Sequence, residues 1–214
     1  MNYSDLRNEM VESQLIKRGI NDPRVLEVMS TVPRENYVPE DVRRHAYEDR
    51  ALPIPGGQSI SQPYMVGIML QALKLDGHEH VLEIGTGSAY QTVLLALLAR
   101  KVDTIEIVPE LAESARQRLN CLGLKNATVY ERDGSGGLPG KEPFDDITVT
   151  AAAPDIPAPY LDQLSPDGKL LLPIGSRDHQ ELVLIEKREK GLMRSVICRC
   201  QFVPLLGEYG FGKE

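Results

Sequence analysis

The sequence predicts an α/β fold in which helices cover both faces of a mostly parallel sheet, with an N-terminal helical cap and a C-terminal antiparallel hairpin. From residue 63 onward, short apolar segments alternate with helical ones through short connections, which is the pattern of a parallel sheet. A glycine-rich turn, IGTG, follows the first apolar segment. Near the end of the chain two extended segments flank the turn-forming residues 189–191, which predicts the hairpin.

We expect residues 1–62 to form the helical cap and a loop, and residues 63–214 to form the core, packed together as one compact unit. Ser4 is suited to cap a first helix and Asp22 a second, because both side chains accept hydrogen bonds from free backbone amides. A third short helix is expected over 41–47.

The segment 51–63, ALPIPGGQSISQP, contains three prolines and two glycines, and we expect an irregular loop there. Ordered loops of this length inside a compact chain usually carry function. Beyond it, helices are expected over 64–75, 89–100 and 110–122, and strands over 80–84, 102–108, 127–132, 146–150, 169–173, 181–188 and 195–203.

The composition is that of a globular chain: of 214 residues 42% are hydrophobic and 26% are charged. The net charge of -7 disfavours nucleic acid as a partner, because such affinity comes largely from cations that neutralise phosphates. No apolar run is long enough for a membrane span, so we expect a cytoplasmic protein without membrane partners. A monomer is also expected, although no sequence pattern indicates the oligomeric state. Three cysteines, with Cys198 and Cys200 only two apart, indicate reduced thiols, and the scattered histidines predict no metal site.

Gly85 and Gly87 lie where the strand 80–84 turns into a helix, so a ligand can approach bare backbone there. A dinucleotide fingerprint would require a third glycine at position 90, where Tyr90 stands. Glu83 comes just before the glycines, and a carboxylate suits the ammonium group of S-adenosylmethionine. The loop therefore predicts this cofactor and not a pyrophosphate.

Two more acids end the next two strands. Glu106 follows Gly85 by about 20 residues, where a carboxylate can accept both ribose hydroxyls. Asp133 could accept from the adenine amino group, while Gly134 leaves room for the ring. Any one of these acids alone could be an ordinary solvated group. Their order along the strands, together with the glycine loop, favours a cofactor site.

The methyl acceptor is indicated by what the fourth strand lacks. No Asn-Pro-Pro-Tyr segment follows it to hold an amino nitrogen, and residues 148–154 read TVTAAAP, a small apolar wall without a general base. A carboxylate would suit such a wall, because it is ionised at neutral pH and needs no base to activate it.

The chain resembles the protein-L-isoaspartate (D-aspartate) O-methyltransferases in order over 11–206, through the segments GQSISQPYM, VLEIGTGSAYQ, TIEIVPELAE, DGSGGLP, PFDDITVTAAAP and FVPL. The resemblance implies a class I, Rossmann-like methyltransferase fold with a rearranged strand order near the carboxyl end. It also implies methyl transfer from S-adenosylmethionine to the free α-carboxylate of L-isoaspartyl and D-aspartyl residues in damaged proteins and peptides, with S-adenosylhomocysteine as product.

By the same resemblance, Ser61 is the active-site residue, and the cofactor contacts come from Gln58, Ser59, Ile60, Glu83, Gly85, Thr86, Gly87, Ser88, Glu106, Asp133 and Gly134. Ser61 could instead cap the helix that begins near Pro63, and both roles are compatible. The segment 203–206 is expected to fold over the site, near the substrate or the methionine end of the cofactor; an ordinary edge strand and frayed tail is the alternative.

Two positions depart from the family pattern, since Ala89 and Arg132 stand where glycine is usual. Arg132 is expected to stack on the adenine ring or obstruct its pocket. Two rival functions remain at this stage: a methyltransferase for another small or nucleic-acid acceptor, and a cofactor-binding protein that has lost catalysis.

Overall fold

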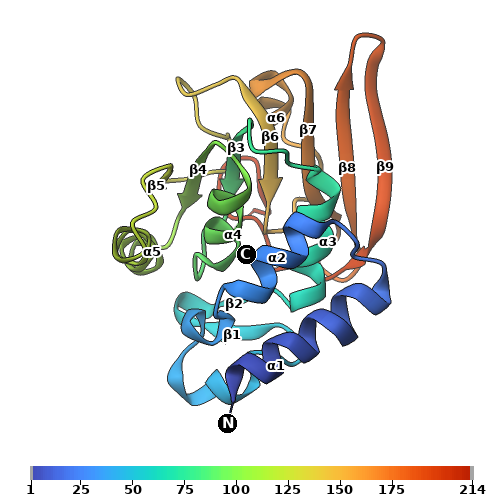
Figure 1. Cartoon of the computed structure of the whole chain (residues 1–214). Helices are drawn as coiled ribbons and strands as arrows, with labels where there is room; N and C mark the ends of the chain where they lie inside the picture. Colours follow the sequence, from blue (N-terminus) through green and yellow to red (C-terminus); the bar gives the residue numbers. More distant parts are fainter. Residues whose placement is uncertain (1, 213–214) are drawn as a thin grey trace.

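The computed structural model describes residues 2–212. It contains a seven-stranded sheet in the order β5-β4-β3-β6-β7-β8-β9 (Figure 1). The strands are β3 (His80–Ile84), β4 (Lys101–Glu106), β5 (Ala127–Glu131), β6 (Phe144–Val149), β7 (Leu164–Gly175), β8 (Gln180–Arg188) and β9 (Gly191–Cys200). Strands β3 to β7 pair in parallel, and β8 and β9 are antiparallel to their neighbours. The predicted fold class, with its C-terminal hairpin, is confirmed.

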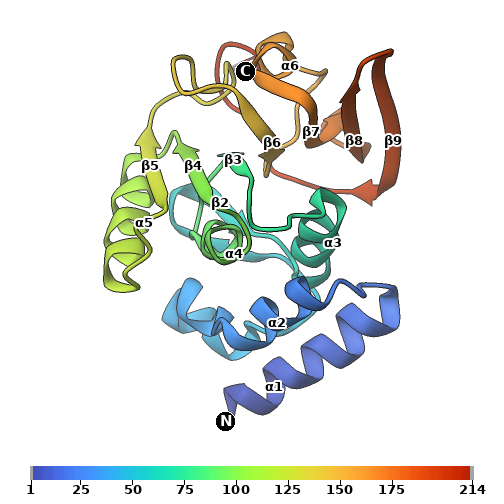
Figure 2. The ribbon, with the colours of Figure 1, turned by 45° about the horizontal axis from the view of Figure 1, so that its top comes forward.

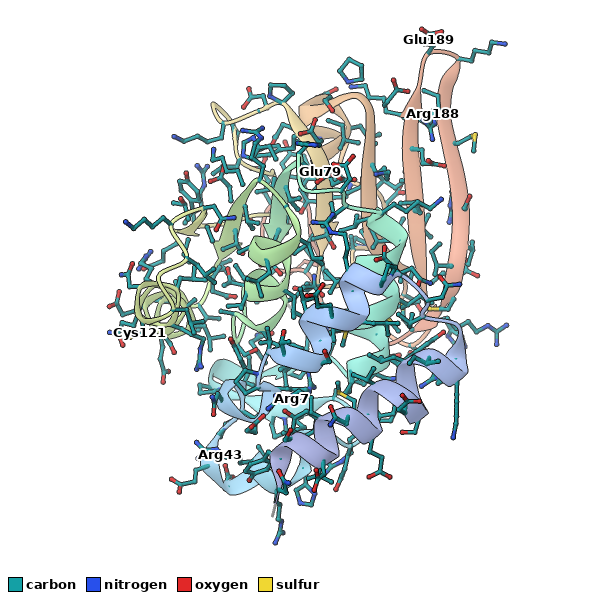
Figure 3. The ribbon with its side chains drawn as sticks, in the orientation of Figure 1. Arg7, Arg43, Glu79, Cys121, Arg188 and Glu189 are labelled. Carbon is teal, nitrogen blue, oxygen red and sulfur yellow. The ribbon has the colours of Figure 1, made fainter. Side chains whose placement is uncertain are left out.

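Helices cover both faces of this sheet, because each face carries its own apolar side chains (Figure 2). One face packs against α3 (Pro63–Leu73), α4 (Tyr90–Leu98) and α5 (Pro109–Cys121). The other packs against α6 (Ala158–Gln163), a helix that the sequence pattern did not predict. Every residue of β3 is buried, as expected for a central parallel strand.

The N-terminal segment packs on α3 and α4 within the same apolar cluster. It contains α1 (Tyr3–Met10), which continues through a wider and then a tighter turn to Gly19, and α2 (Pro23–Thr31). Asp22 caps α2 as predicted, but the cap of α1 is Asn2, whose side chain accepts from the Ser4 amide at 3.1 Å. Ser4 therefore lies inside the first turn.

The expectation of an irregular loop over 51–63 was wrong. Two three-residue strands, β1 (Leu52–Ile54) and β2 (Gln58–Ile60), pair as a small antiparallel hairpin. The tight turn between them places Gly56 and Gly57 at φ of 70° and 68°, a region that glycine adopts without strain. This hairpin leads directly into α3, so residues 58–61 lie between a fixed hairpin and a helix.

Candidate active site

A cavity of about 840 Å³ opens at the carboxyl ends of the central strands, where ligands bind in open α/β sheets. Its walls come from β2 and the start of α3, the β3–α4 turn, the end of β4, and the segment 203–206. Of the predicted site residues, the lining includes Gln58, Ser59, Ile60, Ser61, Gly85, Thr86, Gly87, Ser88, Glu106 and Gly134. Glu83 and Asp133 do not line it.

The β3–α4 turn brings bare backbone to the cavity. Gly85 has φ of 96°, and a Cβ there would stand 2.3 Å from the Thr150 hydroxyl oxygen. Thr150 donates that hydroxyl to the Gly85 carbonyl at 2.7 Å, so it braces the turn from the end of β6. Ala89, at the start of α4, is fully buried with φ of 65°, a conformation that explains why glycine is usual at this position.

Glu106 is the one charged residue among the described residues that line this cavity. Its carboxylate accepts from the Gly87 amide at 2.8 Å and from the Val108 amide at 2.9 Å, so it is anchored to the glycine turn. Ile107 follows it and stays 41% exposed at the cavity wall. Ile107 was not among the predicted site residues, although an apolar residue directly after this acid is visible in the sequence.

Glu83 lies beneath the cavity with no exposed surface. Its Oε2 accepts from the Thr92 hydroxyl at 2.5 Å and from the Thr104 hydroxyl at 2.7 Å. Burial raises the pKa of Glu83 to about 7, against the opposing effect of these two donors. Since Thr104 gives its proton to Glu83, it accepts from Thr86, whose hydroxyl lies 2.7 Å away and lines the cavity. Thr86 therefore turns its own lone pairs toward the cavity.

Asp133 binds the C-terminal segment. Its Oδ1 accepts from the Ser135 amide at 2.8 Å and its Oδ2 from the Glu208 amide at 3.0 Å. Backbone donors from these residues hold the pKa of Asp133 below its usual value, although its partial burial opposes them. The Arg132 side chain is exposed and does not line the cavity, so it does not obstruct the cavity from within.

The C-terminal segment forms one wall of the cavity, as expected for residues 203–206. The Ala152 amide donates to the Val203 carbonyl at 2.8 Å, and the Leu205 amide donates to the Ala152 carbonyl at 2.7 Å. These bonds continue the ladder beyond β6, so the segment is tied to the sheet and is not a frayed tail.

The backbone of Ser61 is held by Arg34, which is fully buried and donates to the Ser61 carbonyl at 2.6 Å. The N-cap residue of α3 is Gln62, and no side chain caps that end of the helix. The structure therefore excludes the helix-cap role for Ser61. Among residues 2–212, no partner accepts or donates to its hydroxyl, so this group is available at the cavity wall.

A second cavity of about 900 Å³ adjoins the first. The two share four lining residues, Ser59, Ser61, Thr150 and Val203. The second cavity continues between the tight turn at Ile16–Arg18 that follows α1, the start of α3 and the lower end of β9, segments that Figure 1 shows side by side. Ser61 therefore stands at the junction of two spaces.

Neither cavity presents a general base. Among the described residues that line them, none is His, Asp or Lys. Burial raises the pKa of Tyr90 to about 12 and that of Cys200 to about 12, so both groups are neutral near pH 7. The Glu106 carboxylate lines the first cavity only, away from the second, and is anchored by two backbone amides. The site therefore suits a reaction whose nucleophile is already deprotonated.

In the described part of the chain, no group of three or more His, Cys, Asp or Glu side chains is arranged to hold a metal ion. The described helices also include none with the length and apolarity needed to cross a bilayer.

Comparison with known proteins shows the family to which the chain belongs. The family model "Protein-L-isoaspartate(D-aspartate) O-methyltransferase" matches residues 6–210. A protein-L-isoaspartate O-methyltransferase from Syntrophobacter fumaroxidans is 49% identical over 211 residues, which cover 99% of each chain. One from Geobacter metallireducens is 47% identical over the full length of both chains.

Two solved structures have the same fold over almost the whole chain. A protein-L-isoaspartate O-methyltransferase matches with a TM-score of 0.85 and 25% identity, over 95% of this chain and 67% of that one. A Plasmodium falciparum structure, described as a putative protein-L-isoaspartate O-methyltransferase in complex with S-adenosyl-L-homocysteine, matches with a TM-score of 0.80 and 26% identity, over 96% and 99%. On the family model and these relatives together, the chain belongs to the protein-L-isoaspartate (D-aspartate) O-methyltransferase family.

Proposed function

We propose that this protein transfers a methyl group from S-adenosylmethionine to the free α-carboxylate of L-isoaspartyl residues, and to the free side-chain carboxylate of D-aspartyl residues, in damaged proteins and peptides. The observation that carries the proposal is the junction at Ser61, where two cavities meet and neither supplies a general base. A carboxylate acceptor needs none, because it is ionised at neutral pH. Membership of the family supports the same reaction.

The first cavity fits S-adenosylmethionine better than a phosphate-bearing cofactor. Its lining contains no cation among the described residues, and its one charge is the carboxylate of Glu106. Gly134 lines the cavity without a side chain, and a Cβ there would stand 3.0 Å from both Ile84 and Ile105, so only glycine fits this apolar corner without movement of its neighbours. When bound, S-adenosylmethionine supplies an electrophilic methyl group on a cationic sulfur.

Each wall of the cavity has a defined task in this proposal. Glu106 accepts hydrogen bonds from the ribose hydroxyls. Thr86 donates its hydroxyl proton to Thr104, which donates to Glu83, so the lone pairs of Thr86 remain free to accept a hydrogen bond from the ammonium group. Gln58, Ser59, Ile60 and Ser88 complete the wall toward the methionine part. Asp133 contributes indirectly, because it accepts a hydrogen bond from the Glu208 amide and so fixes the C-terminal segment that closes the cavity.

Ser61 orients the acceptor. A neutral hydroxyl can donate to one carboxylate oxygen and direct the other at the methyl group, without the strong charge pairing that would weaken the nucleophile. Val203 and Pro204 exclude water on the opposite side. Positioning and dehydration are thus the contributions of the protein, since no proton has to be removed.

The test is the transfer of labelled methyl from S-adenosylmethionine to matched isoaspartyl and aspartyl peptides. We expect methylation of the isoaspartyl peptide to exceed that of the aspartyl peptide by about a hundredfold, because the extra backbone methylene displaces the carboxylate by more than an ångström. Equal rates would contradict the proposal. A parallel set of nucleic-acid and small-molecule acceptors tests the first rival function, and cofactor binding without any transfer would support the second.

A further inference from the structure

The second cavity carries positive charge in an otherwise acidic protein. Two of its lining residues are charged, Arg18 and Arg199, and no acid among the described residues lines it. The chain as a whole has a net charge of -7. A space lined by arginines on such a protein attracts an anion locally while the rest of the surface repels one.

Arg18 is held in a fixed orientation at this cavity. Its guanidinium centre lies 3.4 Å from the centroid of the Tyr64 ring, and its Nη1 pairs with the Asp49 carboxylate at 2.6 Å. Asp49 in turn accepts a hydrogen bond from the Gln62 side chain at 3.4 Å. Such stacking and pairing reduce the entropy that Arg18 would lose on binding a ligand.

Arg18 still has donors to offer. Within residues 2–212, Asp49 is its only hydrogen-bond acceptor, so the Nε and Nη2 groups remain available. A guanidinium presents its donors as a planar fork that matches a carboxylate in two-point contact. Arg199 stands on β9 with Glu181 as its cross-strand neighbour. Arg18 is the better oriented of the two cationic groups, because the Tyr64 ring and Asp49 hold its guanidinium in place.

The position of Arg18 decides which carboxylate it meets. The acceptor carboxylate must reach Ser61, where the two cavities join, whereas Arg18 and Arg199 line only the second cavity. They are therefore placed to contact the part of the peptide beyond the reacting residue. Direct pairing of an arginine with the reacting carboxylate would also weaken it as a nucleophile, which is a reason for keeping the two apart.

We propose that Arg18, assisted by Arg199, forms a subsite that recognises a second carboxylate on the acceptor, either an acidic side chain next to the isoaspartyl residue or the carboxylate at the end of the peptide. This inference rests on the proposed function, since it assigns the second cavity to the acceptor peptide. It makes Arg18 a specificity-determining residue and leaves Ser61 as the residue that touches the reacting group.

The test uses one neutral isoaspartyl peptide with an amidated end and three acidic versions of it. Two carry Glu directly before or directly after the isoaspartyl residue, and the third has a free terminal carboxylate. The quantity compared is the ratio of kcat/KM for each acidic peptide to that for the neutral one, measured for the wild type, Arg18→Gln, Arg199→Gln and the control Lys17→Gln. Lys17 is the exposed neighbour of Arg18 and lines neither cavity, and its replacement by Gln removes the same charge as Arg18→Gln does.

For at least one acidic peptide we expect the wild-type ratio to exceed one by about three- to tenfold, mainly through KM, a range set by the partial exposure of Arg18. Arg18→Gln should bring that ratio close to one, Arg199→Gln should lower it less, and Lys17→Gln should keep it. Which peptide responds identifies the source of the carboxylate.

The inference is overturned if the wild type shows no preference for any acidic peptide, or if Lys17→Gln lowers the ratio as much as Arg18→Gln. A failure of the proposed function would look different, because no isoaspartyl peptide would then be methylated. In that case calorimetric binding of the acidic and neutral peptides to the wild type and Arg18→Gln still decides whether the subsite exists.

Discussion

The buried guanidinium of Arg34 donates from Nη2 to the carbonyl oxygen of Ser61 over 2.6 Å and from Nε to the carbonyl oxygen of Ala46 over 2.8 Å. It also lies 5.1 Å from the centroid of the Tyr90 ring. Burial lowers the pKa of Arg34 to about 10, so it remains charged near pH 7. A cation of the N-terminal cap thus fixes the backbone of the residue at the junction of the two cavities.

Replacing Arg34 should therefore affect both stability and turnover. Arg34→Met leaves two buried carbonyls without a donor, and we expect a loss of about 2 to 5 kcal/mol in the free energy of unfolding. Arg34→Lys keeps the charge but loses the two-armed geometry, so the folded enzyme should turn over more slowly. Urea denaturation and single-turnover methylation check the two effects. Unchanged turnover by folded Arg34→Lys would mean that this contact does not position Ser61.

Ser61→Ala separates the orienting role from a structural one. The Ser61 hydroxyl has no partner among residues 2–212, so the free energy of unfolding should change by less than about 0.5 kcal/mol. Turnover at saturating cofactor should fall a few-fold to about tenfold, corresponding to about 0.5 to 1.5 kcal/mol for one neutral hydrogen bond. The measurement is single-turnover methylation of an isoaspartyl peptide by both proteins. Identical rates would shift the orienting role to backbone groups of 59–62.

Glu106→Ala should weaken cofactor binding. We expect the affinity for S-adenosylhomocysteine to fall by about 1.5 to 3 kcal/mol, because a charged acceptor of the ribose hydroxyls is lost. Glu110→Ala, which removes an equal charge from an exposed position in the first turn of α5, is the matched control. Calorimetry that gives the same affinity for both variants would remove Glu106 from the site.

Two buried acids should make stability fall as pH rises. The pKa of Glu83 rises from 4.5 to about 7 through burial, and that of Asp146 from 3.8 to about 7, also through burial and against the effect of Lys169. Between about pH 4 and 7 the unfolded chain releases protons that the folded protein retains, so ionisation favours unfolding until the folded carboxyls also ionise.

Glu83→Gln tests this dependence. At about 1.4 kcal/mol per pKa unit, Glu83 accounts for a fall of about 3 kcal/mol between pH 5 and pH 8. Relative to the wild type, the variant should therefore gain stability by up to that amount over the same interval, as measured by urea denaturation at both values. Asp146→Asn should behave similarly. Parallel pH profiles for wild type and both variants would show that neither acid retains its proton in the folded state.

Gly207→Ala should loosen the segment that closes the cofactor cavity. Gly207 has φ of 125°, and a Cβ there would stand 2.0 Å from Oδ1 of Asp133, so about 1 to 3 kcal/mol of strain must be relieved by movement. We expect weaker cofactor binding, because residues 203–206 line the cavity. Gly212→Ala, which meets nothing within 4 Å, is the control. Equal affinities for the two variants would contradict a closing role.

The sequence by itself determined the strands of the sheet, the glycine turn, and Glu106 at the end of β4. Alternation of apolar strands and helices is a local pattern, and the positions of Gly85 and Glu106 follow from it. The small hairpin at 52–60 was missed, because strands of three residues are too short to show a period and their prolines and glycines usually indicate irregular structure.

Only the tertiary structure decided which acids face the cofactor cavity. Successive side chains of a strand point to opposite faces, so the packing around each strand end decides whether an acid reaches a cavity or lies beneath it. Glu83 therefore lies under the cavity and acts through two threonines, while Asp133 binds the C-terminal segment. The contact between Arg34 and Ser61, and the cavity between Arg18 and β9, join segments that are distant in the chain. No local pattern encodes such contacts, because they form only when separate elements pack on one core.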